Sequence, residues 1–126
     1  MTDKAKVFAK LSNVRHSPRK MRVTLVGIRG LPANRALERL DISTKKAATY
    51  IRKLLRSAVA NAENNFKYQS DNLVIEEIQV GEGRRLKRPK YRARGRVDMA
   101  KSRYSHVKVV LVEKIKAQSA KSKATD

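Results

Sequence analysis

The sequence predicts a small α+β domain, because three segments follow a helical pattern of apolar residues, one alternates as an exposed strand does, and two are rich in β-forming residues. The chain has 126 residues, of which 40% are hydrophobic, and this length allows a single domain with one core. Lys and Arg number 31 against 11 Asp and Glu, so the formal net charge is +20. Such an excess of positive charge indicates a polyanion as partner.

The first third of the chain predicts a strand followed by a helix. Small and apolar residues alternate with mostly basic ones from Ala5 to Leu11, as in a strand with one exposed face. Ser17 is a good N-cap and Pro18 fits the first position of a helix over about 17–29. Gly30 stands where a left-handed residue would end that helix.

The middle of the chain predicts two more helices, followed by two strands. A short helix is expected over 32–40, and the strongest helical pattern runs over about 45–66, with Ser43 as its candidate cap. Beyond this point the β-rich segments 73–80 and 106–112 predict strands. Helical residues thus come before a pair of strands that can lie antiparallel.

About 25 residues separate these two strands, whereas antiparallel neighbours are normally joined by two to five residues. The connection is either a disordered loop or a hairpin that projects on the order of 30 to 35 Å, at about 3.3 Å per residue. We therefore expect a single domain over 1–126, with a globular core over 1–83 and 104–114 and a basic hairpin extension over 84–103. The polar segment 115–126 is expected to be disordered.

The basic block of the chain lies within this connection. Eight of the thirteen residues from Arg84 to Arg96 are Lys or Arg, and none is acidic. A free hairpin of this composition repels itself, and phosphates on both sides would neutralise it. Its Gly residues would allow a close approach to nucleic acid, and Asp98 is expected to pair with a neighbouring Arg. A solvated basic loop is the alternative, but a position between two strands favours ordered insertion into RNA.

A second candidate contact is the segment from Arg15 to Arg22, where basic residues surround the predicted helix start. Free N–H groups at a helix start can bind phosphate, and an anion there would offset the unfavourable cations. The alternative is a capped surface helix whose charge is incidental.

Other function classes receive little support. The chain has no Cys and two His that stand apart, so neither a metal site nor a Cys nucleophile is predicted. No Gly-rich phosphate loop or nucleophile elbow occurs, and no cofactor is expected. No apolar run reaches the roughly 18 to 20 residues of a membrane span. Two rivals stay open: an architectural DNA-binding protein with a basic β-arm, and an RNA-processing enzyme.

The chain resembles the ribosomal protein family that bacterial nomenclature numbers twenty-two in the large subunit. The resemblance runs from about Lys6 to Glu113. It is carried by the segments 14–22, 28–30, 45–48, 57–65, 83–96 and 105–111, and Ala93-Arg94-Gly95-Arg96 is among the most specific.

The resemblance implies a three-stranded antiparallel sheet packed on three helices, with a long β-hairpin between the last two strands. It also implies a non-enzymatic structural protein that binds rRNA, supports subunit assembly and lines the nascent-peptide exit tunnel. The expected partners are large-subunit rRNA, neighbouring ribosomal proteins and the nascent peptide, and no homo-oligomer is expected. The expected location is the ribosome, in the cytoplasm or in an organelle.

The expected site residues follow from the two basic segments and from this resemblance. The tunnel tip is placed at Lys87, Arg88, Pro89, Lys90, Tyr91 and Arg92. The expected rRNA contacts are Arg15, His16, Arg19, Lys20, Arg22, Arg84, Arg85, Lys87, Arg88, Lys90, Arg92, Arg94, Arg96, Lys101, Arg103 and His106.

Overall fold

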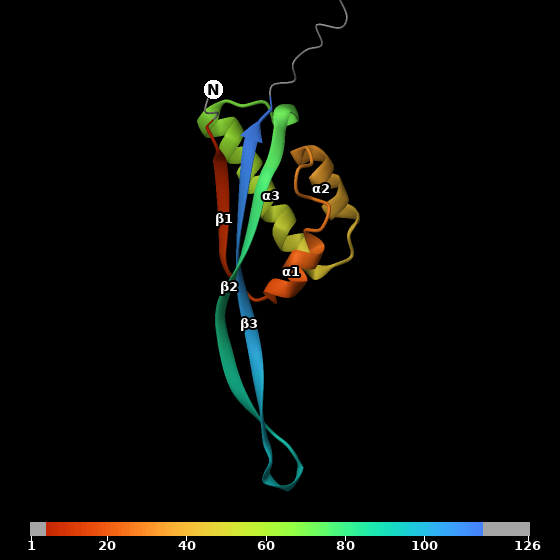
Figure 1. Cartoon of the computed structure of the whole chain (residues 1–126), viewed down its shortest axis with the longest axis vertical. Helices are drawn as coiled ribbons and strands as arrows, with labels where there is room; N and C mark the ends of the chain where they lie inside the picture. Colours follow the sequence, from red (N-terminus) through yellow and green to blue (C-terminus); the bar gives the residue numbers. More distant parts are fainter. Residues whose placement is uncertain (1–4, 115–126) are drawn as a thin grey trace, which may run out of the picture.

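The computed structural model describes residues 5–114 of the chain, so the predicted tail 115–126 lies outside the described residues. Three helices and one antiparallel sheet confirm the predicted α+β class (Figure 1). In chain order the elements are β1 (Val7–Val14), α1 (Pro18–Thr24), α2 (Ala33–Ile42), α3 (Lys46–Phe66), β2 (Leu73–Tyr91) and β3 (Val97–Glu113).

The sheet has the order β1-β3-β2, and both pairs of strands are antiparallel. β1 pairs with β3 from Val7↔Leu111 to Val14↔Ser105 and then ends. β2 and β3 stay paired far beyond this point, as far as Tyr91↔Val97. The connection between the two predicted strands is therefore an ordered hairpin, and Figure 1 shows it extending well past β1 and α1. We call residues 84–103 the arm.

The core lies between the sheet and α3, with α1 and α2 packed beside them (Figure 1). α3 buries one stripe that includes Ile51, Leu55 and Ala58, at helical steps of three and four residues. The sheet buries alternate residues of each strand, among them Val109 and Leu111 of β3. Core packing therefore holds the part of β2 and β3 that lies between the arm and the ends of the hairpin.

The helix predicted over 17–29 is shorter than expected. α1 begins at Pro18 with Ser17 as its N-cap residue, but it ends at Thr24. Gly30 has the expected positive φ, at +83°, yet its N–H donates to the Ile75 carbonyl at 3.0 Å instead of closing a helix. The chain after α1 thus pairs with the edge of β2, and turns rather than helix carry Ile28 into the core.

The other two helices lie close to their predicted positions. α2 starts after Pro32, and α3 starts after Lys45 rather than directly after Ser43, whose Oγ accepts from the Lys45 N–H at 3.4 Å. No helix within residues 5–114 is long and apolar enough to cross a membrane.

Candidate nucleic-acid interface

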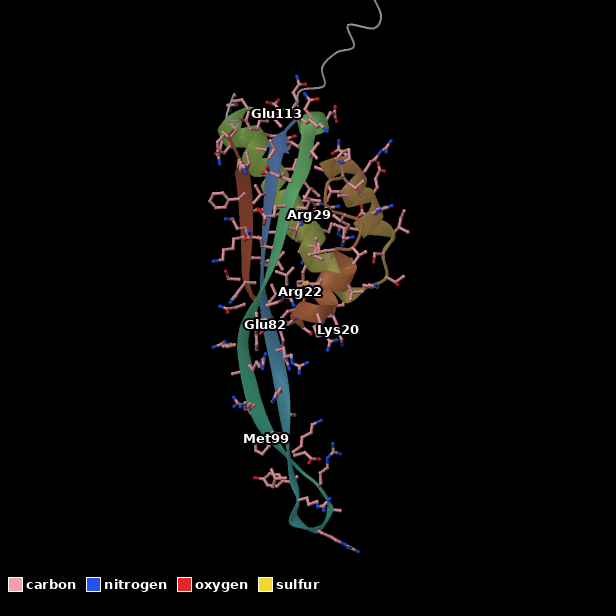
Figure 2. The ribbon with its side chains drawn as sticks, viewed as in Figure 1. Lys20, Arg22, Arg29, Glu82, Met99 and Glu113 are labelled. Atoms are coloured by element: carbon pink, nitrogen blue, oxygen red, sulfur yellow. The ribbon has the colours of Figure 1, made fainter. Side chains whose placement is uncertain are left out.

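The arm is a two-stranded ribbon that closes in a tight turn at Ala93–Gly95. Arg94 and Gly95 adopt positive φ values of 58° and 70°, and the Arg92 N–H donates to the Arg96 carbonyl at 2.7 Å. From Arg85 to Arg94, about ten residues at about 3.3 Å each project on the order of 30 to 35 Å. Figure 2 places Glu82 where the arm leaves the core and Met99 far along it.

The turn lies beyond the six residues predicted as the tunnel tip. Lys87 to Tyr91 belong to β2, and Pro89 pairs with Met99 in the ribbon. Arg92 leads into the turn, while Ala93–Gly95 form its outermost part. Tyr91 is 81% exposed, so its ring is open to a partner.

Like charges stand opposite each other near the base of the arm. Arg85 pairs in register with Arg103, and Lys87 pairs with Lys101. Cross-strand partners share a face of the ribbon, where like charges destabilise the pairing. Glu82, 3.2 Å from Arg85 Nη2, offsets part of this charge, and the face keeps a positive excess over two consecutive rows that an anion would neutralise.

The same face meets the segment around the start of α1, so the fold brings the two predicted contacts together. A hollow of about 130 Å³ is lined by Ser17, Pro18 and Arg19 on one side and by Arg85, Arg103 and the acid Glu82 on the other. A second hollow, of about 320 Å³, places Arg15, His16 and Lys20 beside Lys101 and Arg103. We call the basic residues of these two hollows, together with Lys87, the arm-base cluster: Arg15, His16, Arg19, Lys20, Arg85, Lys87, Lys101 and Arg103.

His16 joins this cluster to α3. Its ring lies 6.1 Å from that of Tyr50, and burial, together with the charges of Lys20 and Lys46, lowers the pKa of His16 below its ordinary value of 6.5. His16 also lines a hollow of about 530 Å³ with Lys20, Lys45 and Lys46. The sequence reasoning did not count these two lysines among the contacts, although a basic pair at the start of the strongest predicted helix was visible.

Outside the arm, the side chains of two predicted contact residues form hydrogen bonds within the protein. The Arg22 guanidinium donates from Nη2 to the Val80 carbonyl at 3.1 Å, which ties α1 to β2. His106 accepts the Asn13 N–H at Nδ1, at 3.0 Å, where Asn13 adopts a φ of 56° in the irregular end of β1. Both side chains thus have a structural role, whatever else they bind.

The acids of the arm region are both paired. Asp98 accepts from Arg92 Nε at 3.0 Å, as expected of a neighbouring Arg, and Glu82 lies 3.2 Å from Arg85 Nη2. The other predicted contact residues of the arm have side chains open to solvent: Arg84, Arg88, Lys90, Arg94 and Arg96.

Gly83 lies in close contact with the neighbouring strand. At Gly83 an added Cβ would lie 2.9 Å from the carbonyl carbon and oxygen of Tyr104. The close approach at Gly83 is thus to the neighbouring strand, at the register shift between Glu82 and Arg85. Among the described residues, no group of three or more His, Cys, Asp or Glu could hold a metal ion.

Comparison with known proteins gives a consistent family. A family model described as ribosomal protein L22p/L17e matches residues 9–112. The large ribosomal subunit protein uL22 of Desulfitobacterium hafniense (strain Y51) is 48% identical over 101 residues, covering 80% of this chain and 89% of the relative. The protein of the same name from Caldicellulosiruptor saccharolyticus is 42% identical over 113 residues, covering 90% and 93%.

A third relative of that name, from Phenylobacterium zucineum, is 42% identical over 106 residues and covers 84% of each chain. The matched region contains all three helices, most of the sheet and the whole arm. The chain therefore belongs to the ribosomal protein L22p/L17e family, whose members are structural proteins of the large ribosomal subunit and not enzymes.

Proposed function

We propose that this chain is a structural constituent of the large ribosomal subunit that binds rRNA through its arm and arm-base cluster. The observation that supports this most is that two consecutive cross-strand pairs carry like charges, Arg85↔Arg103 and Lys87↔Lys101, beside the basic start of α1. The arm carries ten Lys or Arg and one acid, so it is far more stable between phosphates than alone.

The mode of binding follows from the chemistry of these side chains. Arg presents a planar fork that binds phosphate oxygens in pairs, and Lys acts as a point charge. Contacts of this kind position the protein on a folded RNA without reading base sequence. The arm would thus hold rRNA segments on both of its faces together during assembly.

The family resemblance extends this proposal to the exit tunnel. The turn at Ala93–Gly95 and the preceding residues Lys87 to Arg92 form the end of the arm farthest from the core. We assign this end to the tunnel wall, where exposed Tyr91 and the arginines would face rRNA and the nascent peptide. The other proposed partners are neighbouring ribosomal proteins, and the proposed location is the ribosome of the cytoplasm.

A salt titration of rRNA binding tests this function. In the arm-base variant, Arg85, Lys87, Lys101 and Arg103 are replaced by Gln. Each lost phosphate contact lowers the slope of log affinity against log salt by about 0.7 to 0.9, so four lost contacts lower it by about 3. A control variant loses the same charge from exposed residues elsewhere: Arg35, Lys53, Arg56 and Lys114.

The expected result is a marked loss of slope in the arm-base variant and a much smaller change in the control. The wild-type chain should also prefer large-subunit rRNA to duplex DNA at matched salt. Equal slopes in the two variants would contradict the assignment of the arm base, and equal affinity for duplex DNA would favour an architectural DNA-binding protein.

A further inference from the structure

The sheet has a second face, opposite the helices, which no helix of the described chain covers (Figure 1). On β1, exposed Phe8 and Lys10 alternate with buried Val7 and Ala9. On β3, the half-buried residues between buried Ser105, Val107 and Val109 point to this same face: Tyr104, His106 and Lys108.

Cations and aromatic rings are interleaved on this open face. Lys108 Nζ lies 5.0 Å from the ring centroid of Phe8, and the guanidinium carbon of Arg84 lies 5.3 Å from that of Tyr104. Both distances are within the range of cation–π attraction. Phe8 is still 60% exposed, so most of its ring is open to a partner.

The charge on this face is also unbalanced at one row. Lys10 stands directly opposite Lys108, a like-charge pair that weakens the strand pairing. At the β2 side of the face, Glu76 pairs with Lys6 at 3.1 Å, whereas Glu77 accepts from the neutral amide of Gln79 at 2.9 Å and keeps its charge. An anion beside Lys10 and Lys108 would thus offset a local repulsion.

We propose that this open face, the sheet platform, binds an unpaired segment of RNA, with a base stacked on Phe8 and phosphates beside Lys10 and Lys108. The proposal rests on the proposed rRNA-binding function and adds a second contact surface on the side of the sheet away from the arm-base cluster. The platform consists of Phe8, Lys10, Arg84, Tyr104, His106 and Lys108.

RNA fits this surface better than a protein partner does. Aromatic side chains on an open sheet stack unpaired bases, and neighbouring cations bind the backbone between them. A protein interface would need a larger apolar centre, whereas the apolar residues on this face are Phe8 with Val110 opposite it and the pair Val74 and Val112, and charged side chains follow from Lys10 onward. The Phe8 and Tyr104 rows lie about 20 Å apart along β3, six residues at about 3.3 Å, so one short segment could contact both rings.

Binding of the full-length chain to a fluorescent, unstructured 12-nucleotide RNA tests the platform. Phe8→Leu keeps apolar volume and removes the ring, and Phe66→Leu makes the same change at the end of α3. Stacking of a base contributes roughly 1–3 kcal/mol by substitution, so Phe8→Leu should weaken binding by about 5- to 150-fold. Phe66→Leu should bind within twofold of the wild type.

Lys10→Gln is a second variant, and it leaves the aromatic ring of Phe8 and the buried residues of β1 unchanged. It should lower the salt slope of binding to this RNA by about 0.7, the value for one contact with a single strand. Lys10 is exposed, so this variant keeps the proposal testable if Phe8→Leu does not fold, which urea unfolding would show. Wild-type affinity in Phe8→Leu, or an unchanged slope in Lys10→Gln, would overturn the platform.

The arm-base variant in the same assay separates the two proposals. If it weakens binding while the platform variants do not, the rRNA-binding function stands and the platform is wrong. If none of the variants weakens binding to this RNA, the platform is wrong, and the salt titration with rRNA decides the proposed function separately. In intact large subunits, a photoreactive benzoylphenylalanine at position 8 should crosslink to rRNA, and a crosslink to another protein would refute RNA as the occupant.

Discussion

Replacing Gly83 by alanine tests how the arm is joined to the core. Gly83 lies in the register shift between the pairs Glu82↔Ser105 and Arg85↔Arg103. A methyl group there would lie 2.9 Å from the carbonyl carbon and oxygen of Tyr104 and 3.0 Å from its Cβ. Two of these three atoms belong to the backbone, so the two strands must move apart to relieve the overlap.

Overpacking of this kind costs about 1–3 kcal/mol. Ser105, which follows Tyr104, is fully buried, so the register shift should unfold together with the core. The loss should therefore appear in the global free energy of unfolding. Gly81 is the matched control, because a methyl group there would meet His106 atoms no closer than 3.9 Å.

Urea unfolding of the full-length variants, followed by far-ultraviolet circular dichroism, measures this difference. Gly83→Ala should be less stable by about 1–3 kcal/mol with an unchanged dependence on urea. Gly81→Ala should be neutral or more stable by up to about 1 kcal/mol, because alanine loses less entropy in a strand. Equal stability of the two variants would refute the close contact at Gly83 as the joint of the arm.

Three further predictions concern the core and the arm-base cluster. Because burial and two nearby lysines lower the pKa of His16 in the folded state, the unfolded state binds more protons. Stability linked to His16 should be present above pH 6.5 and lost as the pH falls below it, and His16→Gln should remove this dependence in urea unfolding at several pH values. Leu55 on α3 is 1% exposed, so Leu55→Ala should lower the free energy of unfolding by about 2–5 kcal/mol. A change below about 1 kcal/mol would argue against the place of Leu55 in the core. Arg22→Gln should lose about 0.5–1.5 kcal/mol of stability with its hydrogen bond to β2, while a drop in the salt slope of rRNA binding would instead mark Arg22 as a phosphate contact.

The periodicity of the sequence was sufficient to predict the positions of the helices and strands that pack into the core. Helical spacing placed α3 within one residue, and β-rich segments located the paired ends of β2 and β3. The end of α1 was not predictable in this way. Met21 and Ile28 both fit a helical stripe, but Gly27 adopts a φ of 80°, which a helix does not allow, and the chain continues from Leu25 in turns.

The candidate site was predictable in its charge but not in its arrangement. The arm and the segment around Arg15 were found separately, because sequence spacing does not show that Arg19 lies beside Arg103. The like-charge rows depend on a register that the one-residue shift at Gly83 sets. The proposed platform could not be predicted from the sequence, because Phe8 fits the pattern of an alternating strand and its neighbours on β3 depend on the strand register.

Hydrogen exchange of the arm amides tests the central electrostatic account most directly. The amides of residues 84–103 would be compared in the free protein and in assembled large subunits, with buried Val107 to Leu111 of β3 as the internal reference. The account predicts fast exchange of the arm in the free protein and strong protection in the subunit, because phosphates neutralise its repelling rows. Equal protection of the arm in both states would contradict it.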